Sequence, residues 1–289
     1  MSNQLRFSGH ESFQCRYYWL KKGYDFIQNE GDFNSDDAPV QLGVGKNMVA
    51  GIKYWLKAFG VFDYENKELS DLGKRIFDDK GWDPFLEDQG TLWLLHYYLV
   101  KQNHASIYSM IFNELRKERP EFSPNHFISL VEREGGSVSP NTLKTDLQIF
   151  GRTYVPREDS KDLDETYSGL LTELNLVSKS KKEIEVKGKP SKIDSYTIEP
   201  KRRSEIPAEI LLYCILEGEE QSNSISFDTM YNLGVGSIFA LTREGLIEKL
   251  EEIGEKYDWI NFSNEAGIRE LQLSKQSQAF DILKNYYEG

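Results

Sequence analysis

One order of elements recurs three times along this chain of 289 residues. In each occurrence, amphipathic helices are followed by two short alternating segments that flank a turn, which is the spacing of a β-hairpin. Helices followed by a hairpin wing are the order of a winged helix-turn-helix. The sequence therefore predicts a mainly α protein with short β-hairpin wings, built as three tandem winged-helix-like units.

The recurring order of helices and hairpin sets the bounds of these predicted units. The N-terminal unit covers residues 1–102, the middle unit covers 103–203 and the C-terminal unit covers 204–289. The alternative is a series of generic small helical domains, in which a hairpin directly after the longest helix is less common. We therefore favour the winged-helix-like arrangement.

A glycine-rich stretch, QLGVGKNMVAGIKY at residues 41–54, resembles a phosphate-binding loop at first sight. A Walker loop requires a glycine five positions before its second glycine and a Ser or Thr after its lysine. Val40 and Asn47 occupy those two positions. The stretch instead predicts a glycine turn that begins a helix, with one apolar face directed into the core.

The outer face of that predicted helix is polar and carries no acidic residue. It presents Lys46, Asn47, Lys53, Tyr54 and Lys57. Lysine reaches phosphates, and asparagine can read the edge of adenine. We predict that this face contacts DNA, and the alternative is an ordinary solvated helix surface.

The middle unit contains a second helix of this kind. Ser139 is a good N-cap and Pro140 fits the first helical position. Lys144, Gln148 and Arg152 form a second predicted DNA-binding patch on this helix. The wing that follows this helix is basic, because residues 179–203 hold nine Lys or Arg against four acidic residues. We expect its two strands at 183–188 and 194–200, joined by a loop at 189–193.

The C-terminal unit repeats part of the glycine-rich stretch. Leu233-Gly-Val-Gly-Ser237 copies four letters from Leu42, and a helix is expected from there to about Ile253. Its exposed face would carry four glutamates, which would repel DNA: Glu244, Glu248, Glu251 and Glu252. This unit is therefore expected to bind protein or to pack internally.

Composition limits the classes of function. The net charge of −12 argues against a broad, sequence-independent grip on nucleic acid but leaves room for a local basic face. Two distant cysteines and four histidines show no metal-ligand spacing, so we expect neither a metal nor a cofactor. No apolar run approaches the roughly 20 residues that span a bilayer, and the N-terminus does not resemble a signal peptide. The sequence predicts a cytoplasmic protein with no membrane partner.

A catalytic alternative rests on four residues. His10, Glu11, Asp88 and His96 could together form a metal-dependent nuclease site, although their spacing does not require one. The interpretation we favour is structural. In it, a buried His–Glu hydrogen bond pins the N-terminus to a helix at Thr91 to Val100.

Four long motifs resemble a known family: RFSGHESFQCRYYWLKKGYDF, VQLGVGKNMVAGIKYWLKAFGVF, ELSDLGKRIFD and DPFLEDQGTLWLLHYYL. The chain is similar over nearly its whole length to an uncharacterised bacterial and archaeal family, the domain of unknown function four thousand and seven. The resemblance implies an accessory protein of gene clusters for DNA phosphorothioate modification and phage defence, near sulfurtransferase-like and ATPase components. It carries over no catalytic residue.

The resulting hypothesis is a non-catalytic DNA-binding or adaptor protein of a DNA sulfur-modification or anti-phage defence system. Its expected partners are DNA and the protein components of such a complex. Two alternatives stay open, namely a purely protein-binding scaffold for the modification enzymes and the metal-dependent nuclease. The sequence does not define the oligomeric state.

Overall fold

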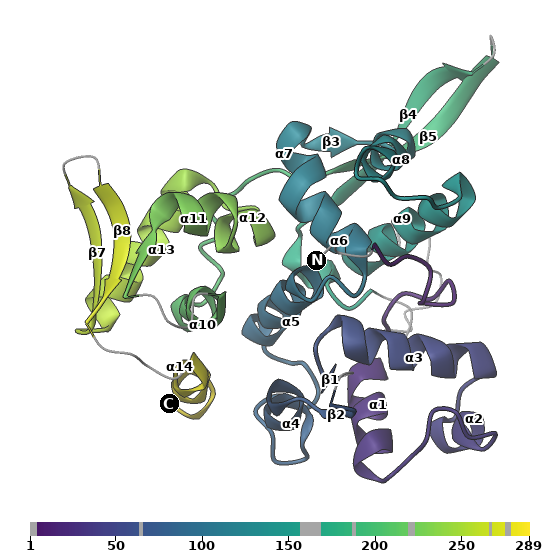
Figure 1. The fold of residues 1–289 in the computed structure, drawn as a ribbon, viewed down its shortest axis with the longest axis horizontal. Helices are drawn as coiled ribbons and strands as arrows, with labels where there is room; N and C mark the ends of the chain where they lie inside the picture. The colour runs from purple at the N-terminus through teal and green to yellow at the C-terminus, as the bar shows by residue number, and fades with distance from the viewer. Residues whose placement is uncertain are drawn as a thin grey trace. The chain divides into compact units, whose positions relative to one another are not determined.

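The structure is a computed structural model that describes residues 5–63, 66–156, 169–186, 189–218, 223–265, 268–274 and 279–289. It is largely helical, with small antiparallel sheets (Figure 1). The chain divides into two compact units, Met1–Ile198 and Glu199–Gly289. The further division of the first unit near residue 102 stays a prediction. None of the helices among these residues is long and apolar enough to cross a membrane.

The first part of unit 1 contains five helices and one short hairpin. These are α1 (Trp19–Gln28), α2 (Ala38–Leu42), α3 (Lys46–Ala58), β1 (Phe62–Asp63), β2 (Glu68–Leu69), α4 (Asp71–Phe77) and α5 (Gln89–Lys101). The predicted helix of the glycine-rich stretch and the hairpin after it are confirmed. Helix α5 is buried on all sides from Gly90 to Val100, so it forms the centre of the core.

The rest of unit 1 combines helices with a three-stranded sheet. Its elements are α6 (Ser106–Met110), a π-helical turn (Ile111–Leu115), α7 (Arg116–Glu118), β3 (Glu121–Phe122), α8 (Pro124–Arg133), α9 (Pro140–Tyr154), β4 (Ser178–Val186) and β5 (Lys189–Thr197). The strand order is β3-β5-β4. Ser139 caps α9 by accepting a hydrogen bond from the Thr142 amide, as predicted.

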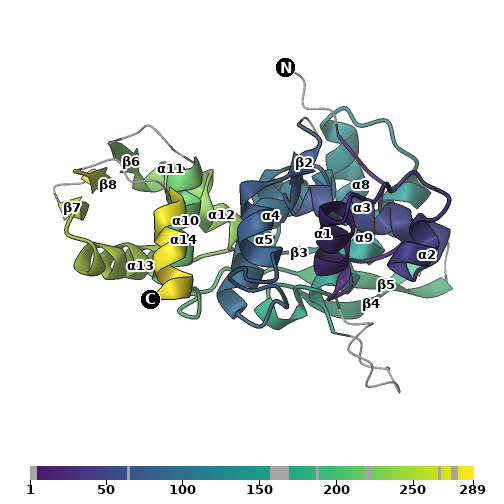
Figure 2. The same ribbon diagram turned by 90° about the horizontal axis from the view of Figure 1, so that it is seen from below.

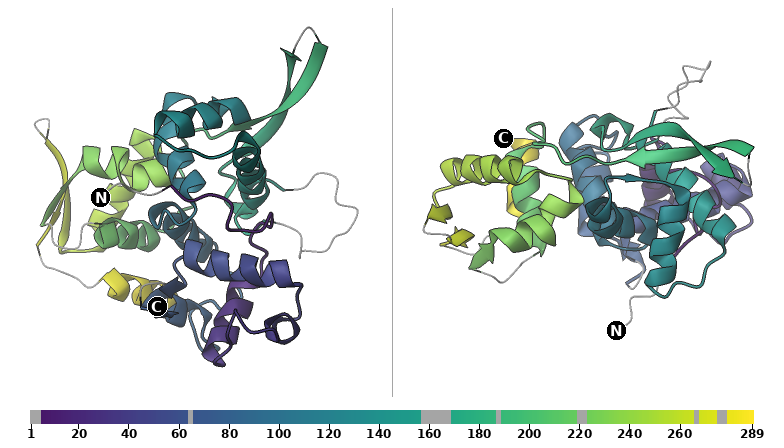
Figure 3. Two further views of the ribbon diagram at one scale, coloured as in Figure 1. Left: turned by 45° about the vertical axis from the view of Figure 1, so that its right-hand side comes forward. Right: turned by 90° about the horizontal axis from the view of Figure 1, so that it is seen from above.

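The basic hairpin is longer than predicted. The expected loop at 189–193 lies within β5, and Val186 already pairs with Lys189. Figures 1 and 3 show this hairpin projecting beyond the helices. The side chains from Ser178 to Glu183 are all exposed, so burial does not alternate along this part of β4. The sequence also predicts a helix at 165–174. Residues 165–168 lie outside the described residues, and residues 169–174 form an isolated β-bridge at Gly169 and a 3₁₀ turn at Thr172–Leu174 in place of that helix.

Unit 2 repeats the same order of elements. It contains α10 (Ala208–Gly218), β6 (Ser224–Ser226), α11 (Phe227–Asn232), α12 (Val235–Ile238), α13 (Arg243–Lys256), β7 (Ile260–Glu265), β8 (Ile268–Leu273) and α14 (Ala279–Glu288). Its strand order is β6-β8-β7, which matches β3-β5-β4 position for position. In both sheets a short strand that precedes two or more helices pairs with the second strand of the later hairpin.

The repeated Leu-Gly-Val-Gly letters predict the same glycine turn before a helix in both units, and this prediction was wrong. Leu42 is buried at the end of α2, and Gly43 follows it with φ +61°. Leu233 is instead 78% exposed and precedes the short helix α12. The single helix expected after Leu233–Ser237 and up to about Ile253 does not form. Helix α12 ends at Ile238, the chain turns at Ala240 (φ +49°), and Thr242 caps the new helix α13.

Candidate nucleic-acid interface

Helix α3 presents part of its predicted face to solvent. Lys46 and Asn47 are exposed in its first turn, whereas Lys53 and Lys57 are half-buried. Lys53 Nζ donates a hydrogen bond of 3.0 Å to Asn34 Oδ1 in the loop before α2. The helix carries no acidic residue, so this face is positively charged.

Tyr54 does not lie on that face. It is only 9% exposed, and burial raises the pKa of its hydroxyl well above the usual range. Its ring lies 5.8 Å from the ring of His10 and 5.2 Å from that of His104. The N-terminal segment therefore covers Tyr54, and the available part of the face consists of Lys46, Asn47, Lys53 and Lys57.

The segment that covers Tyr54 comprises residues 5–13 and is called the N-terminal arm below. It passes between α3 and α9 (Figures 1 and 2). His10 Nε2 donates a 3.1 Å bond to Asp146 Oδ1 of α9, while the Ser8 amide donates to Oδ2. The Ser12 amide donates to His10 Nδ1, so this nitrogen is the acceptor and Nε2 carries the proton.

The arm is also held against α3. The indole of Trp55 is stacked on the His10 ring at 6.3 Å, and its Nε1 donates a 3.0 Å bond to the Phe13 carbonyl. Three residues of the arm adopt left-handed φ values, which fold it tightly: Ser8, Glu11 and Ser12. The arm is therefore an ordered part of the fold of unit 1, held by hydrogen bonds and ring contacts.

The predicted partner of His10 was wrong. The sequence suggested a glutamate and a contact with the helix at Thr91 to Val100, whereas the acceptor is Asp146, 136 residues away. A signal existed, because Asp146 lies on the inner side of α9 beside Leu147. A carboxylate in an apolar stripe requires a partner.

The other catalytic candidates take part in separate interactions. His96 Nδ1 lies 2.8 Å from the Tyr154 hydroxyl inside the core. Asp88 caps α5 by accepting from the amides of Gly90 and Thr91, and Glu11 is exposed. Among the described residues, no three His, Cys, Asp or Glu side chains gather in a way that could hold a metal ion.

Helix α9 presents the second predicted patch. Lys144, Gln148 and Arg152 are exposed along one side. The one acid of this helix, Asp146, is buried on the opposite side in its bond with His10. The positive charge of Arg152 acts on Tyr196 of β5, which places the patch next to the hairpin.

The basic hairpin is partly neutralised by acids. Lys179 pairs with Asp194 at 2.8 Å, Lys182 pairs with Glu121 at 2.6 Å and Lys192 lies 3.6 Å from Glu183. These ion pairs lie at the surface, where each contributes little to the stability of the fold. Each lysine can therefore exchange its carboxylate partner for another anion.

Helix α13 of unit 2 has the opposite charge. The predicted glutamates Glu244, Glu248, Glu251 and Glu252 are all exposed. Two of them pair locally, Glu248 with Arg202 at 2.6 Å and Glu252 with Lys249 at 2.8 Å. The two units thus present helices of opposite sign at the position before the hairpin.

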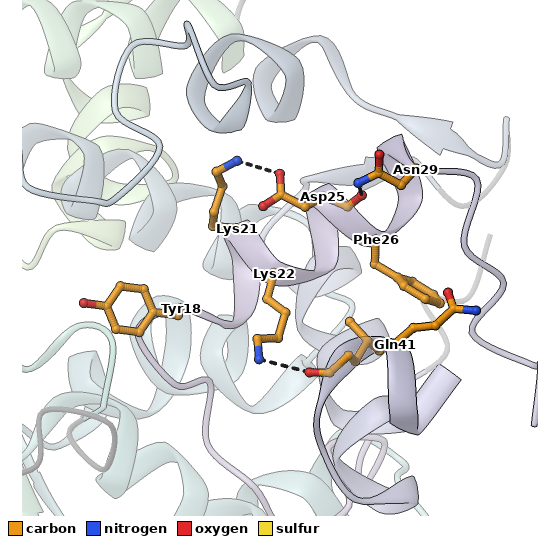
Figure 4. Close-up of a pocket in the computed structure, with 8 residues that line it drawn as sticks. Tyr18, Lys21, Lys22, Asp25, Phe26, Asn29 and Gln41 are labelled. Carbon is orange, nitrogen blue, oxygen red and sulfur yellow. Dashed lines mark hydrogen bonds and ion pairs between the residues drawn. The ribbon is translucent and has the colours of Figure 1, made fainter. Parts of the chain in front are cut away.

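A surface hollow lies beside α1 and α2 (Figure 4). The cations that line it are already engaged. Lys21 bonds to Asp25 at 2.5 Å and to Asp79 at 2.7 Å, and Lys22 donates to the Leu42 carbonyl at 3.0 Å. None of the sequence-predicted site residues lines this hollow.

These observations define a protein of small helix-and-hairpin units whose most distinctive surfaces are charged helix faces. The chain belongs to the family described as Protein of unknown function (DUF4007), which matches residues 7–287. This match confirms the resemblance carried by the four sequence motifs. No curated protein matches the chain.

Two solved structures share the fold across almost the entire chain. The first, described as "SspB crystal structure", is 25% identical, with a TM-score of 0.82 over 99% of this chain and 88% of that one. The second, "Magnesium ion-bound SspB crystal structure", is 24% identical, with a TM-score of 0.80 and the same coverage. The magnesium ion is a property of that protein.

Proposed function

We propose that this protein is a non-catalytic DNA-binding component of a DNA sulfur-modification or anti-phage defence system. The observation that carries this proposal is the pair of acid-free outer faces on α3 and α9, which expose Lys46, Asn47, Lys144, Gln148 and Arg152. The family resemblance and the likeness to SspB support the biological setting.

The proposed architecture is a series of winged-helix-like units. Its support is the repeated order of helix, strand, helices and hairpin, together with the matching strand orders of the two sheets. In such a unit the last helix before the hairpin enters the major groove and the wing follows the backbone. Helix α9 and the β4–β5 hairpin have these positions in the middle unit.

Each exposed side chain has a distinct role in the proposed complex. Lys144 and Arg152 neutralise backbone phosphates, and Gln148 is able to hydrogen-bond an adenine edge. The chain as a whole carries a net charge of −12, and α13 exposes four glutamates. That negative charge repels DNA elsewhere and so directs it to the basic faces.

The test compares two charge-reversed variants of the full chain. Lys144→Glu with Arg152→Glu is expected to weaken binding to a fluorescein-labelled duplex by about 30-fold, on the order of 2 kcal/mol, because two phosphate contacts become repulsive. Fluorescence anisotropy at low salt measures this affinity.

The matched control is Lys80→Glu with Lys284→Glu, which changes the net charge equally at two other exposed positions. We expect the control to bind DNA almost as tightly as the wild type. Equal loss in both variants would mean that only net charge matters. Unchanged binding in the α9 variant would remove α9 from the interface.

The exposed glutamates of α13 favour a second candidate, a protein-binding scaffold for the modification enzymes. This function predicts no binding of duplex DNA even at low salt. It also predicts co-purification with a modification enzyme that is lost when Glu244 and Glu251 are replaced by lysine. DNA binding with the α9 dependence described above would contradict a purely scaffolding role.

A further inference from the structure

Four nitrogen-bearing side chains from three separate segments meet beside the N-terminal arm. Arg6 comes from the arm, Lys53 and Lys57 come from α3, and His104 comes from the connection between α5 and α6. Arg6 Nη1 lies 3.1 Å from His104 Nδ1. Lys57 is close enough to Arg6 and Lys53 for both charges to act on it.

The cluster is held in place by the fold. The Arg6 amide donates a 2.9 Å bond to Ser106 Oγ, and the Ser106 amide donates to the Arg6 carbonyl at 3.2 Å. Ser106 is fully buried at the start of α6. Asn103 takes a left-handed φ of +49° directly before His104, and Lys53 is tied to Asn34. These contacts preorganise Arg6, His104 and Lys53.

The groups repel one another electrostatically. Burial, together with Lys53 and Arg6, lowers the pKa of Lys57 to about 8. Burial, together with Arg6 and Lys57, lowers the pKa of His104 to about 4. The positive charge of Arg6 acts on both groups, so an anion placed beside it would relieve this repulsion.

The hydrogen-bonding capacity of the cluster also suits an anion. A guanidinium only donates, so His104 Nδ1 accepts from Arg6 and Nε2 carries the ring proton. The cluster therefore presents a guanidinium, two ammonium groups and one imidazole N–H, all of which donate. Phosphate oxygens are acceptors that match such a set.

We propose that Arg6, Lys57 and His104, with Lys53 at the edge, form an anchor for a single phosphate group. This inference deepens the proposed function and rests on it where the phosphate belongs to the DNA backbone. A free phosphate offers the same chemistry, so the test includes both sources.

The test uses the full chain with two probes, inorganic phosphate and a labelled duplex. Phosphate at about ten times its Kd is expected to raise the wild-type Tm by about 2 °C relative to chloride of equal ionic strength. Arg6→Gln with Lys57→Gln should abolish this shift and weaken duplex binding about tenfold. The Lys144→Glu, Arg152→Glu variant should keep the phosphate shift, because its substitutions lie on α9.

The outcomes separate the anchor from the proposed function. A phosphate shift that needs Arg6 and Lys57, in a protein that binds no duplex, would support an anchor for free phosphate and sink the DNA-binding function. The anchor would be overturned, and the proposed function would stand, if two results occurred together. Phosphate would not raise the Tm of the wild type, and the Arg6→Gln, Lys57→Gln variant would bind the duplex as tightly as the wild type. A phosphate shift equal in wild type and variant would also overturn it.

A pH series gives a second readout that does not depend on folding. Lys57 loses its charge as the pH rises through about 8, whereas phosphodiesters do not titrate there. Arg6, Lys53, His104 and Tyr54 face it. His104 and Tyr54 do not titrate over this range, because burial lowers the pKa of His104 to about 4 and raises the pKa of Tyr54 well above its usual value. Duplex affinity should therefore fall between pH 7 and pH 9 in the wild type and fall less in Lys57→Arg. The same pH dependence in both would contradict a role for Lys57.

Discussion

Asp146→Ala is expected to lower the free energy of unfolding by about 3 kcal/mol, because it leaves the buried His10 without its acceptor. Asp146 is 2% exposed and accepts from both His10 Nε2 and the Ser8 amide. Urea unfolding followed by tryptophan fluorescence measures the loss. Four of the five tryptophans lie in unit 1, so this signal reports mainly on the unit that contains the bond.

Asp146→Asn is the matched control. Asparagine retains one carbonyl acceptor, so we expect a loss of only about 1 kcal/mol. His10→Ala should be nearly as damaging as Asp146→Ala, and the double variant should be little worse than either, because both changes remove the same interaction. A loss below about 1 kcal/mol in Asp146→Ala, or additive effects, would show that this bond does not hold the arm.

Trp55→Ala is expected to cost about 4 kcal/mol, since large-to-small changes in a packed core leave a cavity. Trp55 is completely buried, with its ring against His10, Phe59 and Tyr108. Its Nε1 also holds the Phe13 carbonyl, so the change frees the arm from the α3 side. Trypsin should then cut at Arg6 and Arg16 faster than in the wild type.

Trp55→Phe separates packing from the hydrogen bond. It keeps most of the aromatic volume and loses the indole N–H, so a loss of about 2 kcal/mol is expected. Its rate of cleavage by trypsin should lie between those of the wild type and Trp55→Ala. If Trp55→Ala had the same free energy of unfolding and the same rate of cleavage by trypsin as the wild type, the packing of the arm against Trp55 would be contradicted.

Elements with strong local signals were predictable from sequence. The boundaries of α3 follow from its glycine turn and apolar stripe, and α9 begins where Ser139 and Pro140 indicate. Local sequence patterns failed to predict the structure of the repeated Leu-Gly-Val-Gly tetrapeptide, because its two copies pack in different surroundings. Leu42 ends a helix packed on Phe26, whereas Leu233 has no comparable cover, so the shared tetrapeptide adopts two structures.

The sites depend on contacts between distant segments, which periodicity does not encode. The bond between His10 and Asp146 joins residues 136 positions apart. Tyr54 has the spacing of an outer-face residue, yet the arm covers it, and no helical pattern predicts that cover. Arg6 and His104 join Lys57 only after the arm is seated, so the proposed phosphate anchor is a product of tertiary structure.

The salt dependence of duplex binding shows whether the basic faces of unit 1 bind DNA. For a protein that neutralises several phosphates, the logarithm of the observed affinity falls linearly with the logarithm of salt concentration, at about 0.9 per phosphate. We expect a wild-type slope of about −4. The slope should be shallower by about two in Lys144→Glu with Arg152→Glu and unchanged in Lys80→Glu with Lys284→Glu. A slope near zero, or no duplex binding at low salt, would contradict DNA binding by these faces.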